Sequence, residues 1–166
     1  TMPPEAWGLT TRPNGELAVG CESVVELAAR FGTPLHVIHE ARLLQTCREF
    51  IDAVAGAYPG KAGVYYAMKC NSVAAVVSAV RTAGLRAEVA TPYELDLARR
   101  IGFGADEIIV NGPCKSNEFL ETLLAQSVRL VVVDSLDELD ALASKADSQA
   151  TAAPILSSGQ TECGRS

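Results

Sequence analysis

A lysine that follows a short apolar segment has the clearest chemical potential in this sequence. Lys69 comes directly after residues 64–68, whose side chains we expect to be buried. An amine at the mouth of a buried strand is partly desolvated, which favours its neutral, nucleophilic form. A lysine in that state can form a Schiff base with a carbonyl compound. The alternative is a solvated lysine at the end of a strand, and this segment alone leaves both interpretations open.

Other charged residues lie close to the ends of the predicted strands that come next. Glu88 lies near the end of one strand, Glu94 follows it, and Lys115 comes after another. Active sites of parallel α/β folds lie at the C-terminal ends of the strands, where the loops converge. Glu88 is therefore a candidate partner of Lys69, and a solvated strand-end carboxylate is the alternative. We expect Glu94 to stabilise a first helical turn and Lys115 to be a solvated loop cation rather than a catalytic group.

The elements that must position these residues repeat along the chain from residue 60. Short β-rich segments recur roughly every 20 residues with helical patterns between them, which is the spacing of a βα unit with parallel strands. Strands are predicted over residues 63–67, 86–90, 107–111, 129–133 and 153–156, and helices over residues 72–83, 92–101, 117–126 and 136–145. An open doubly wound sheet and an α/β barrel both fit this periodicity.

The residues before the repeat, 1–39, are predicted to form a strand, a helix and a second strand. Residues 17–19 can form one short strand, and Ser23 is the predicted N-cap of the helix that follows. Pro34 imposes extended geometry on the residue before it, so the apolar residues 35–38 are predicted to be the second strand.

Residues 40–156 are predicted to form the main domain, which starts with a long amphipathic helix over residues 41–57. Residues 157–166 have no periodicity, and we expect an irregular, disordered tail there.

Length and charge exclude several classes of protein. The chain has 166 residues, whereas a complete eight-stranded α/β barrel needs about 250 residues. A net charge of −6 argues against a nucleic-acid or anionic-membrane partner, since both select basic surfaces. The N-terminal residues lack the pattern of a signal peptide, and no apolar run is long enough to cross a membrane.

The cysteines favour a reducing compartment. The sequence has 5 cysteines and 2 histidines, and no cysteine pair has the spacing of a zinc site, so we expect no metal. Five is an odd number, and the chain is not a small secreted scaffold. Reduced thiols in the cytoplasm are therefore the preferred interpretation.

The segment around Lys69 resembles a known cofactor-binding motif. Residues 65–72 are Tyr-Tyr-Ala-Met-Lys-Cys-Asn-Ser. They resemble the aromatic-Ala-x-Lys-x-Asn segment that carries the cofactor lysine in fold-type III pyridoxal-phosphate decarboxylases, the ornithine and diaminopimelate decarboxylase group. Four further segments resemble motifs of this family in the same order: residues 32–37, 88–94, 111–116 and 132–139.

The resemblance implies a parallel (β/α) barrel of the alanine racemase-like type, of which residues 40–156 hold about five of the eight strands. It implies that Lys69 forms the Schiff base with pyridoxal 5'-phosphate and that Ala67 and Glu88 also lie at the cofactor. Glu88, where the family mostly has aspartate, would bias the protonation of Lys69. The implied substrate is a small amino acid that loses carbon dioxide, and the implied assembly is a homodimer.

Several parts of the family pattern have no counterpart in the sequence, among them the histidine that stacks on the cofactor and a Gly-rich phosphate loop. His36 and His39 precede the barrel, and we expect them to be ordinary strand-end residues. The sequence therefore predicts a truncated decarboxylase chain that is inactive alone. The alternatives are a non-catalytic fragment or regulatory paralogue that pairs with a full-length subunit, and a racemase or pyridoxal-phosphate carrier protein.

Overall fold

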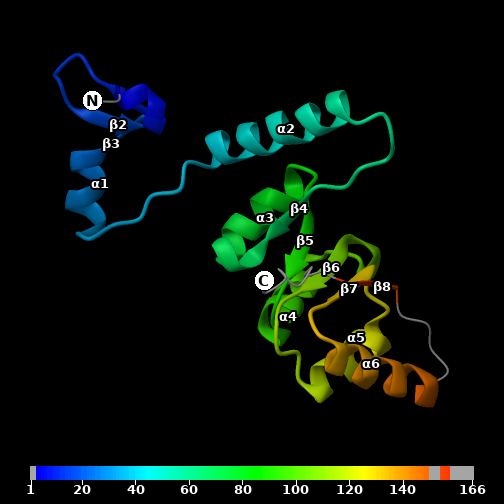
Figure 1. Ribbon diagram of the computed structural model, residues 1–166. Coiled ribbons are helices and arrows are strands. Elements are labelled where there is room, and N and C mark those ends of the chain that lie inside the picture. The colour runs from blue at the N-terminus through cyan, green and yellow to red at the C-terminus, as the bar shows by residue number, and fades with distance from the viewer. Residues whose placement is uncertain (1–2, 150–153, 158–166) are drawn as a thin grey trace, which may run out of the picture.

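The computed structural model describes residues 3–149 and 154–157, which form two separate sheets (Figure 1). The smaller sheet is antiparallel and consists of β1 (Leu9–Thr11), β2 (Leu17–Val19) and β3 (Glu22–Ser23), in that order. The larger sheet consists of β4 (Tyr65–Ala67), β5 (Arg86–Val89), β6 (Ile108–Asn111), β7 (Leu130–Val133) and β8 (Ile155–Ser157). Its 5 strands are parallel and lie in sequence order. This order confirms the predicted chain of βα units.

The helices also lie where the periodicity places them. Two precede the larger sheet, α1 (Val24–Phe31) and α2 (Glu40–Ala57), and four follow its strands, α3 (Ala74–Thr82), α4 (Pro92–Ile101), α5 (Asn117–Gln126) and α6 (Leu136–Gln149). Short 3-10 helices are η1 (Pro4–Trp7), η2 (Met68–Cys70) and η3 (Ala105–Glu107). Ser23, Thr91 and Ser116 each cap a helix by accepting a hydrogen bond from the backbone N–H three residues on. The predicted cap at Ser23 is therefore confirmed.

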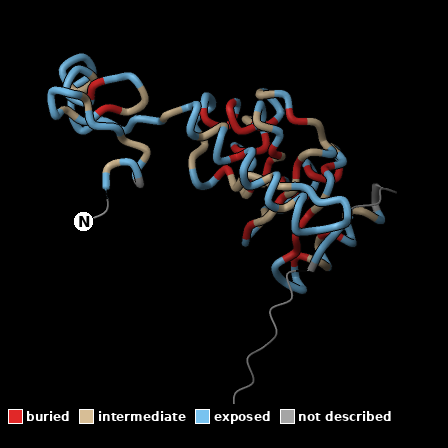
Figure 2. Tube along the Cα trace, turned by 90° about the horizontal axis from the view of Figure 1, so that it is seen from above, coloured by how far each residue is buried: buried red, intermediate tan, exposed pale blue. Residues whose placement is uncertain are grey.

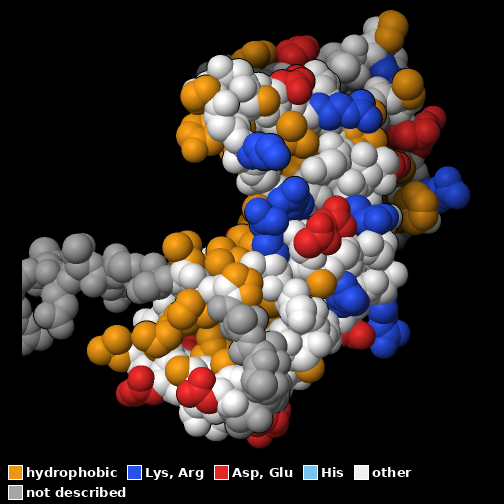
Figure 3. Space-filling view, turned by 90° about the vertical axis from the view of Figure 1, so that its right-hand side faces the viewer, with side chains coloured by type: hydrophobic (Ala, Val, Ile, Leu, Met, Phe, Trp, Pro, Cys, Tyr) orange, Lys and Arg blue, Asp and Glu red, His pale blue; other side chains and the backbone are white. Residues whose placement is uncertain are grey.

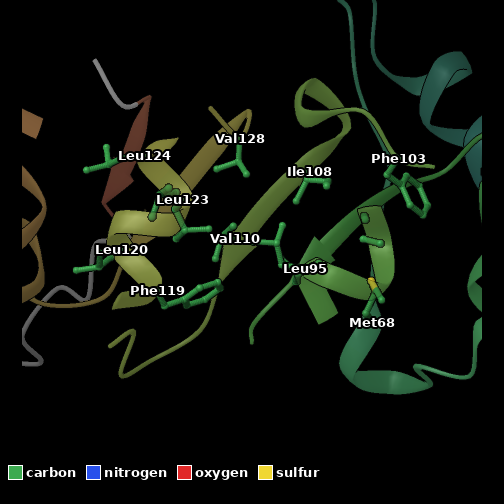
Figure 4. Close-up of a cluster of buried hydrophobic side chains, with 14 of the residues drawn as sticks. Met68, Leu95, Phe103, Ile108, Val110, Phe119, Leu120, Leu123, Leu124 and Val128 are labelled. Atoms are coloured by element: carbon green, nitrogen blue, oxygen red, sulfur yellow. The ribbon is translucent and has the colours of Figure 1, made fainter. Parts of the chain in front are cut away.

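The main core lies between the larger sheet and its helices (Figure 4). Alternate strand residues such as Val89, Ile108 and Val110 are fully buried there, because successive side chains of a strand point to opposite faces. Leu95, from α4, and Leu120, from α5, pack against them. The remaining strand residues therefore point to the other face of the sheet, and Glu88 and Asn111 are among them.

A second cluster joins α2 to α3. Its buried members are Cys47, Val76, Val80 and Leu85. Tyr66, on β4, packs against both this cluster and the main core. Tyr66 therefore links the strand that precedes Lys69 to both apolar cores. Buried positions concentrate in the larger sheet and the helices around it, whereas the N-terminal sheet and α1 are mostly exposed or intermediate (Figure 2).

The predicted strand over residues 35–38 is wrong. These residues form no strand, and Leu35, Val37 and Ile38 are 38%, 43% and 54% exposed. An apolar extended segment becomes a strand only when a neighbouring strand satisfies its backbone groups, and residues 33–39 instead link α1 to α2 (Figure 1). His39 accordingly lies at the N-cap of α2 rather than at the end of a strand.

Two elements of the N-terminal part were not predicted. β1 and β3 have 3 and 2 residues, which is too short for a period of two to be recognised. The predicted tail, except residue 157, lies outside the described residues.

Candidate active site

Lys69 lies in η2, directly after β4, at the C-terminal end of the larger sheet. Its Nζ is 4.0 Å from Oε1 of Glu88. The Lys69 side chain is 65% exposed, as in the alternative of a solvated lysine at the end of a strand. The apolar residue of this turn is its neighbour Met68, which is fully buried and packs in the main core. The backbone of the turn is thus anchored while the amine of Lys69 remains accessible.

Glu88 connects Lys69 to the next strand of the sheet. It lies on β5 directly beside Ala67 of β4 in the register of the sheet, and its side chain is 17% exposed. Its Oε1 accepts a hydrogen bond of 3.1 Å from Nδ2 of Asn111, the last residue of β6. Lys69, Glu88 and Asn111 therefore come together from three consecutive strand ends. This is the arrangement expected of parallel strands, whose C-terminal ends share one edge.

Tyr66 holds the turn that carries Lys69. Its hydroxyl donates a hydrogen bond of 3.1 Å to the carbonyl oxygen of Asn71. The Asn71 side chain in turn accepts a bond of 3.0 Å from the backbone N–H of Val73, which precedes α3. Burial is the largest cause that raises the pKa of Tyr66, and the nearby thiols of Cys70 and Cys47 raise it further. The pair Tyr65-Tyr66 is part of the motif around Lys69, but the pattern alone does not indicate this hydrogen bond.

Glu94 acts on the loop between β5 and α4, as its position in a first helical turn suggests. It is 7% exposed, and its Oε2 accepts a bond of 2.7 Å from the backbone N–H of Ala90. Its own N–H donates to Oγ1 of Thr91. These reciprocal bonds fix the segment that directly follows Glu88 and β5.

The expectation for Lys115 is wrong. Its side chain is fully buried, with 0% exposure, and lies 2.6 Å from Oε1 of Glu138, whose side chain is 8% exposed. Within the loop that carries Lys115, Cys114 has a positive φ of 60°. Nothing in the sequence pattern indicates this pair, because Lys115 lies in the loop after β6, Glu138 lies in the first turn of α6, and the two are 23 residues apart.

Neither a metal site nor a membrane helix is found in residues 3–149 and 154–157. No group of three or more His, Cys, Asp or Glu side chains is arranged there to hold a metal ion. None of the described helices is both long and apolar enough to cross a bilayer.

Comparison with known proteins places this geometry in a family. Residues 41–160 match the family described as pyridoxal-dependent decarboxylase, pyridoxal binding domain. The chain belongs to this family. The parallel sheet is accordingly part of a pyridoxal-dependent decarboxylase barrel, which confirms the predicted fold class and the predicted cofactor of the family, pyridoxal phosphate.

Two curated relatives are diaminopimelate decarboxylases. The one from Actinosynnema pretiosum subsp. auranticum is 37% identical over 142 residues, covering 85% of this chain and 31% of the relative. The one from Bacillus methanolicus is 35% identical over 133 residues, covering 79% of this chain and 31% of the relative. The chain therefore spans about a third of the length of these relatives.

Solved structures agree with this assignment. Diaminopimelate decarboxylase from M. jannaschii in co-complex with L-lysine superposes with a TM-score of 0.82 at 25% identity, covering 90% of this chain and 35% of that chain. Lysine/ornithine decarboxylase from Vibrio vulnificus complexed with putrescine gives a TM-score of 0.61 at 25% identity, covering 81% of this chain and 35% of that chain.

The residues present fit pyridoxal phosphate. A lysine amine can hold an aldehyde cofactor as a Schiff base, and the Lys69 amine is exposed at a strand end, where a cofactor can reach it. A carboxylate that is itself held by a hydrogen bond lies 4.0 Å away, at Glu88. The site residues Lys69, Glu88 and Ala67 thus form a compatible set, and their roles remain predictions.

Proposed function

We propose that this chain binds pyridoxal phosphate through Lys69 and forms the cofactor-binding part of an amino-acid decarboxylase. The observation that carries the proposal is the approach of Lys69 Nζ to Glu88 Oε1, 4.0 Å apart at the ends of adjoining strands, in a chain that belongs to a pyridoxal-dependent family. When bound, the cofactor supplies an electron-withdrawing ring that stabilises the charge left as carbon dioxide departs.

Each residue of the site contributes a distinct property. Lys69 provides the amine that holds the cofactor covalently. Glu88 places a carboxylate oxygen beside that amine, 4.0 Å from its nitrogen. Asn111 orients the Glu88 carboxylate by donating to the same oxygen that faces Lys69. Ala67 lies beside Glu88 in the register of the sheet, so it would lie next to a cofactor held by Lys69.

We propose a substrate of the diaminopimelate class. The support comes from the relatives, two of which are named diaminopimelate decarboxylases, and from a solved structure of such an enzyme that holds L-lysine. These compounds are amino acids with a second amine at the far end of the side chain.

Covalent trapping tests the role of Lys69. The chain is incubated with pyridoxal phosphate, reduced with borohydride and mapped by mass spectrometry. We expect the label on Lys69 and its loss in Lys69→Ala. Lys61, which is exposed, is the internal control for unspecific labelling, and Lys115 should stay unlabelled because its amine is buried. An even distribution over the exposed lysines, or undiminished labelling of Lys69→Ala, would contradict the proposal.

We also propose that the protein works as a homodimer in the cytoplasm. Apolar side chains gather beside charged ones on the face shown in Figure 3. Two large apolar side chains, Tyr93 and Leu136, are 66% and 78% exposed, and exposed apolar surface suits an interface.

The thiols support the second assignment, the cytoplasm. Cys21, Cys47, Cys70 and Cys114 are free thiols, as suits a reducing compartment. Cell fractionation should recover the protein with cytoplasmic markers, and recovery in the membrane fraction would contradict the assignment to the cytoplasm. Sedimentation equilibrium should give twice the protomer mass, and the mass of a monomer would contradict the homodimer.

A further inference from the structure

The buried pair of Lys115 and Glu138 has no place in the function proposed so far. The Lys115 Nζ donates to the carbonyl oxygens of Gly112 at 2.7 Å and Val132 at 2.8 Å, and to Oε1 of Glu138 at 2.6 Å. An ammonium group has three protons, so all three are bonded. Burying a charged pair is costly, and such a pair persists only with good geometry and satisfied donors. Its location should therefore indicate what it does.

The pair lies at the point where β6 and β7 end. Asn111 and Val132 are the last residues paired between these strands. Lys115 joins the carbonyl of Val132 to that of Gly112, the residue after Asn111. Lys115 therefore adds one cross-strand link just beyond the backbone ladder, at the position of Asn111.

Glu138 extends the link to the next loop. Its Oε2 accepts from the backbone N–H of Asp134 at 3.4 Å, and its own N–H donates to Oγ of Ser135 at 3.1 Å. The loop after β6, the end of β7 and the first turn of α6 are thus tied to one buried ammonium group.

Asn111 transmits this constraint to the candidate active site. Its Nδ2 donates to Glu88 Oε1, which is the oxygen that lies 4.0 Å from Lys69 Nζ. The backbone leaves little slack here, since a Cβ on Gly112 would lie 3.0 Å from the Cβ of Ala90. A shift of Gly112 would therefore displace Asn111 relative to β5.

We propose that Lys115 is a positioning residue, which fixes Asn111 and through it the Glu88 carboxylate beside Lys69. This inference rests on the proposed function, because it concerns the orientation of the cofactor held by Lys69. Lys115 is not a second amine for the cofactor, since its side chain has 0% exposure and all three of its protons are donated.

The test replaces the pair by neutral residues of similar size, as in Lys115→Met/Glu138→Gln. Removing both charges avoids leaving one of them buried and unpaired, so the fold can be retained. The matched control is Lys145→Met/Glu121→Gln, which removes the ion pair of the same residue types between α6 and α5, where the carboxylate is 53% exposed.

Two readouts separate positioning from stability. The first is the visible circular dichroism of the chain loaded with pyridoxal phosphate, which reports how the bound ring is oriented in its chiral site. The second is the apparent affinity for pyridoxal phosphate. For Lys115→Met/Glu138→Gln we expect an altered dichroism and an affinity about two- to tenfold lower, the lower part of the range for residues coupled in one hydrogen-bond network. The control pair should leave both unchanged.

A double-mutant cycle identifies the route. In an Asn111→Ala background, Lys115→Met/Glu138→Gln should change neither readout further, because the connection to Glu88 is already cut. Additive effects, or wild-type dichroism in Lys115→Met/Glu138→Gln, would overturn the inference while leaving Lys69 labelling, and so the proposed function, intact. Absence of Lys69 labelling in the wild-type chain would overturn both.

If that variant does not fold, Lys115→Leu/Glu138→Leu decides, because apolar residues often replace a buried ion pair without loss of stability. Its dichroism should differ from that of the wild type as that of Asn111→Ala does. Wild-type dichroism in this second variant would overturn the assignment to Lys115.

Discussion

The hydroxyl of Tyr66 holds the turn that carries Lys69, and Tyr66→Phe removes only that oxygen. The phenyl ring keeps its packing against both apolar clusters. The change therefore isolates one hydrogen bond, from the Tyr66 hydroxyl to the carbonyl of Asn71 at 3.1 Å. That bond closes a loop of backbone with Lys69 at its centre.

The magnitude follows from the surroundings of this bond. A neutral hydrogen bond contributes about 1 kcal/mol to stability. Asn71 is only partly buried, so water can reach its carbonyl once the hydroxyl is gone, and no larger desolvation cost arises. We expect Tyr66→Phe to lower the free energy of unfolding by about 1 kcal/mol and the melting temperature by about 2–4 °C.

The functional effect should exceed that of a matched substitution one residue away. Tyr65 Oη accepts from Arg86 Nη1 at 3.2 Å, at the start of β4 and β5, so Tyr65→Phe also loses one hydrogen bond. Urea unfolding gives the stability of each variant, and the rate of pyridoxal-phosphate trapping on Lys69 gives the effect on the site. We expect slower trapping in Tyr66→Phe and an unchanged rate in Tyr65→Phe. Equal rates in the two variants would refute the assigned role of Tyr66.

Three further outcomes test the fold and its charges. Leu120 is 1% exposed, so Leu120→Ala should lower the free energy of unfolding in urea by about 2–5 kcal/mol. Leu136 is 78% exposed, so Leu136→Ala should change it by less than about 0.5 kcal/mol. Similar losses in the two variants would contradict the placement of Leu120 in the core. Burial raises the pKa of the Cys47 thiol, so alkylation at about pH 8 should modify exposed Cys70 well before Cys47, and the reverse order would be inconsistent with the packing of α2. Hydrogen bonds from its own backbone N–H and from Ser116 lower the pKa of Glu118. Its stabilising contribution is therefore present above the unfolded-state pKa of about 4.3 and is lost as the pH falls through the folded-state pKa. Lowering the pH should destabilise the wild type more than Glu118→Gln, and parallel curves of stability against pH would disprove this.

The repeat of strands and helices could be predicted because the buried faces of these elements require apolar residues at regular spacing in the sequence. Segments such as residues 130–133, apolar on both faces, can be recognised without knowing their neighbours. Residues 35–38 are also mostly apolar, yet they form no strand, because a strand needs a neighbouring strand to pair with, and the pattern of a single segment does not show whether one is present. β1 and β3 were not predicted because segments of 3 and 2 residues are too short to show a period of two.

The candidate site was predictable only where topology determines it. Lys69 and Glu88 follow consecutive parallel strands, so their proximity follows from the order of the elements. The burial of Lys115 depends instead on the conformation of a loop, in which Cys114 has a positive φ, and on an acid in a distant helix. Long-range contacts of this kind between irregular segments leave no periodic signal. The sequence left open whether Lys69 is buried or solvated, and the structure buries its neighbour Met68 while the Lys69 side chain is 65% exposed.

The order of the strands also determines how the site can assemble. Tyr65 pairs with Arg86 and Ala87 with Ile108, so each pairing closes a segment of about twenty residues, at a modest and nearly constant entropic cost. During synthesis, where segments fold as they emerge, each new βα unit can add to a neighbour that is already in place. The lysine, its carboxylate and the amide that orients it need only the first three strands of the larger sheet. The candidate active site can thus begin to form while the ribosome is still adding the residues of the later strands and helices.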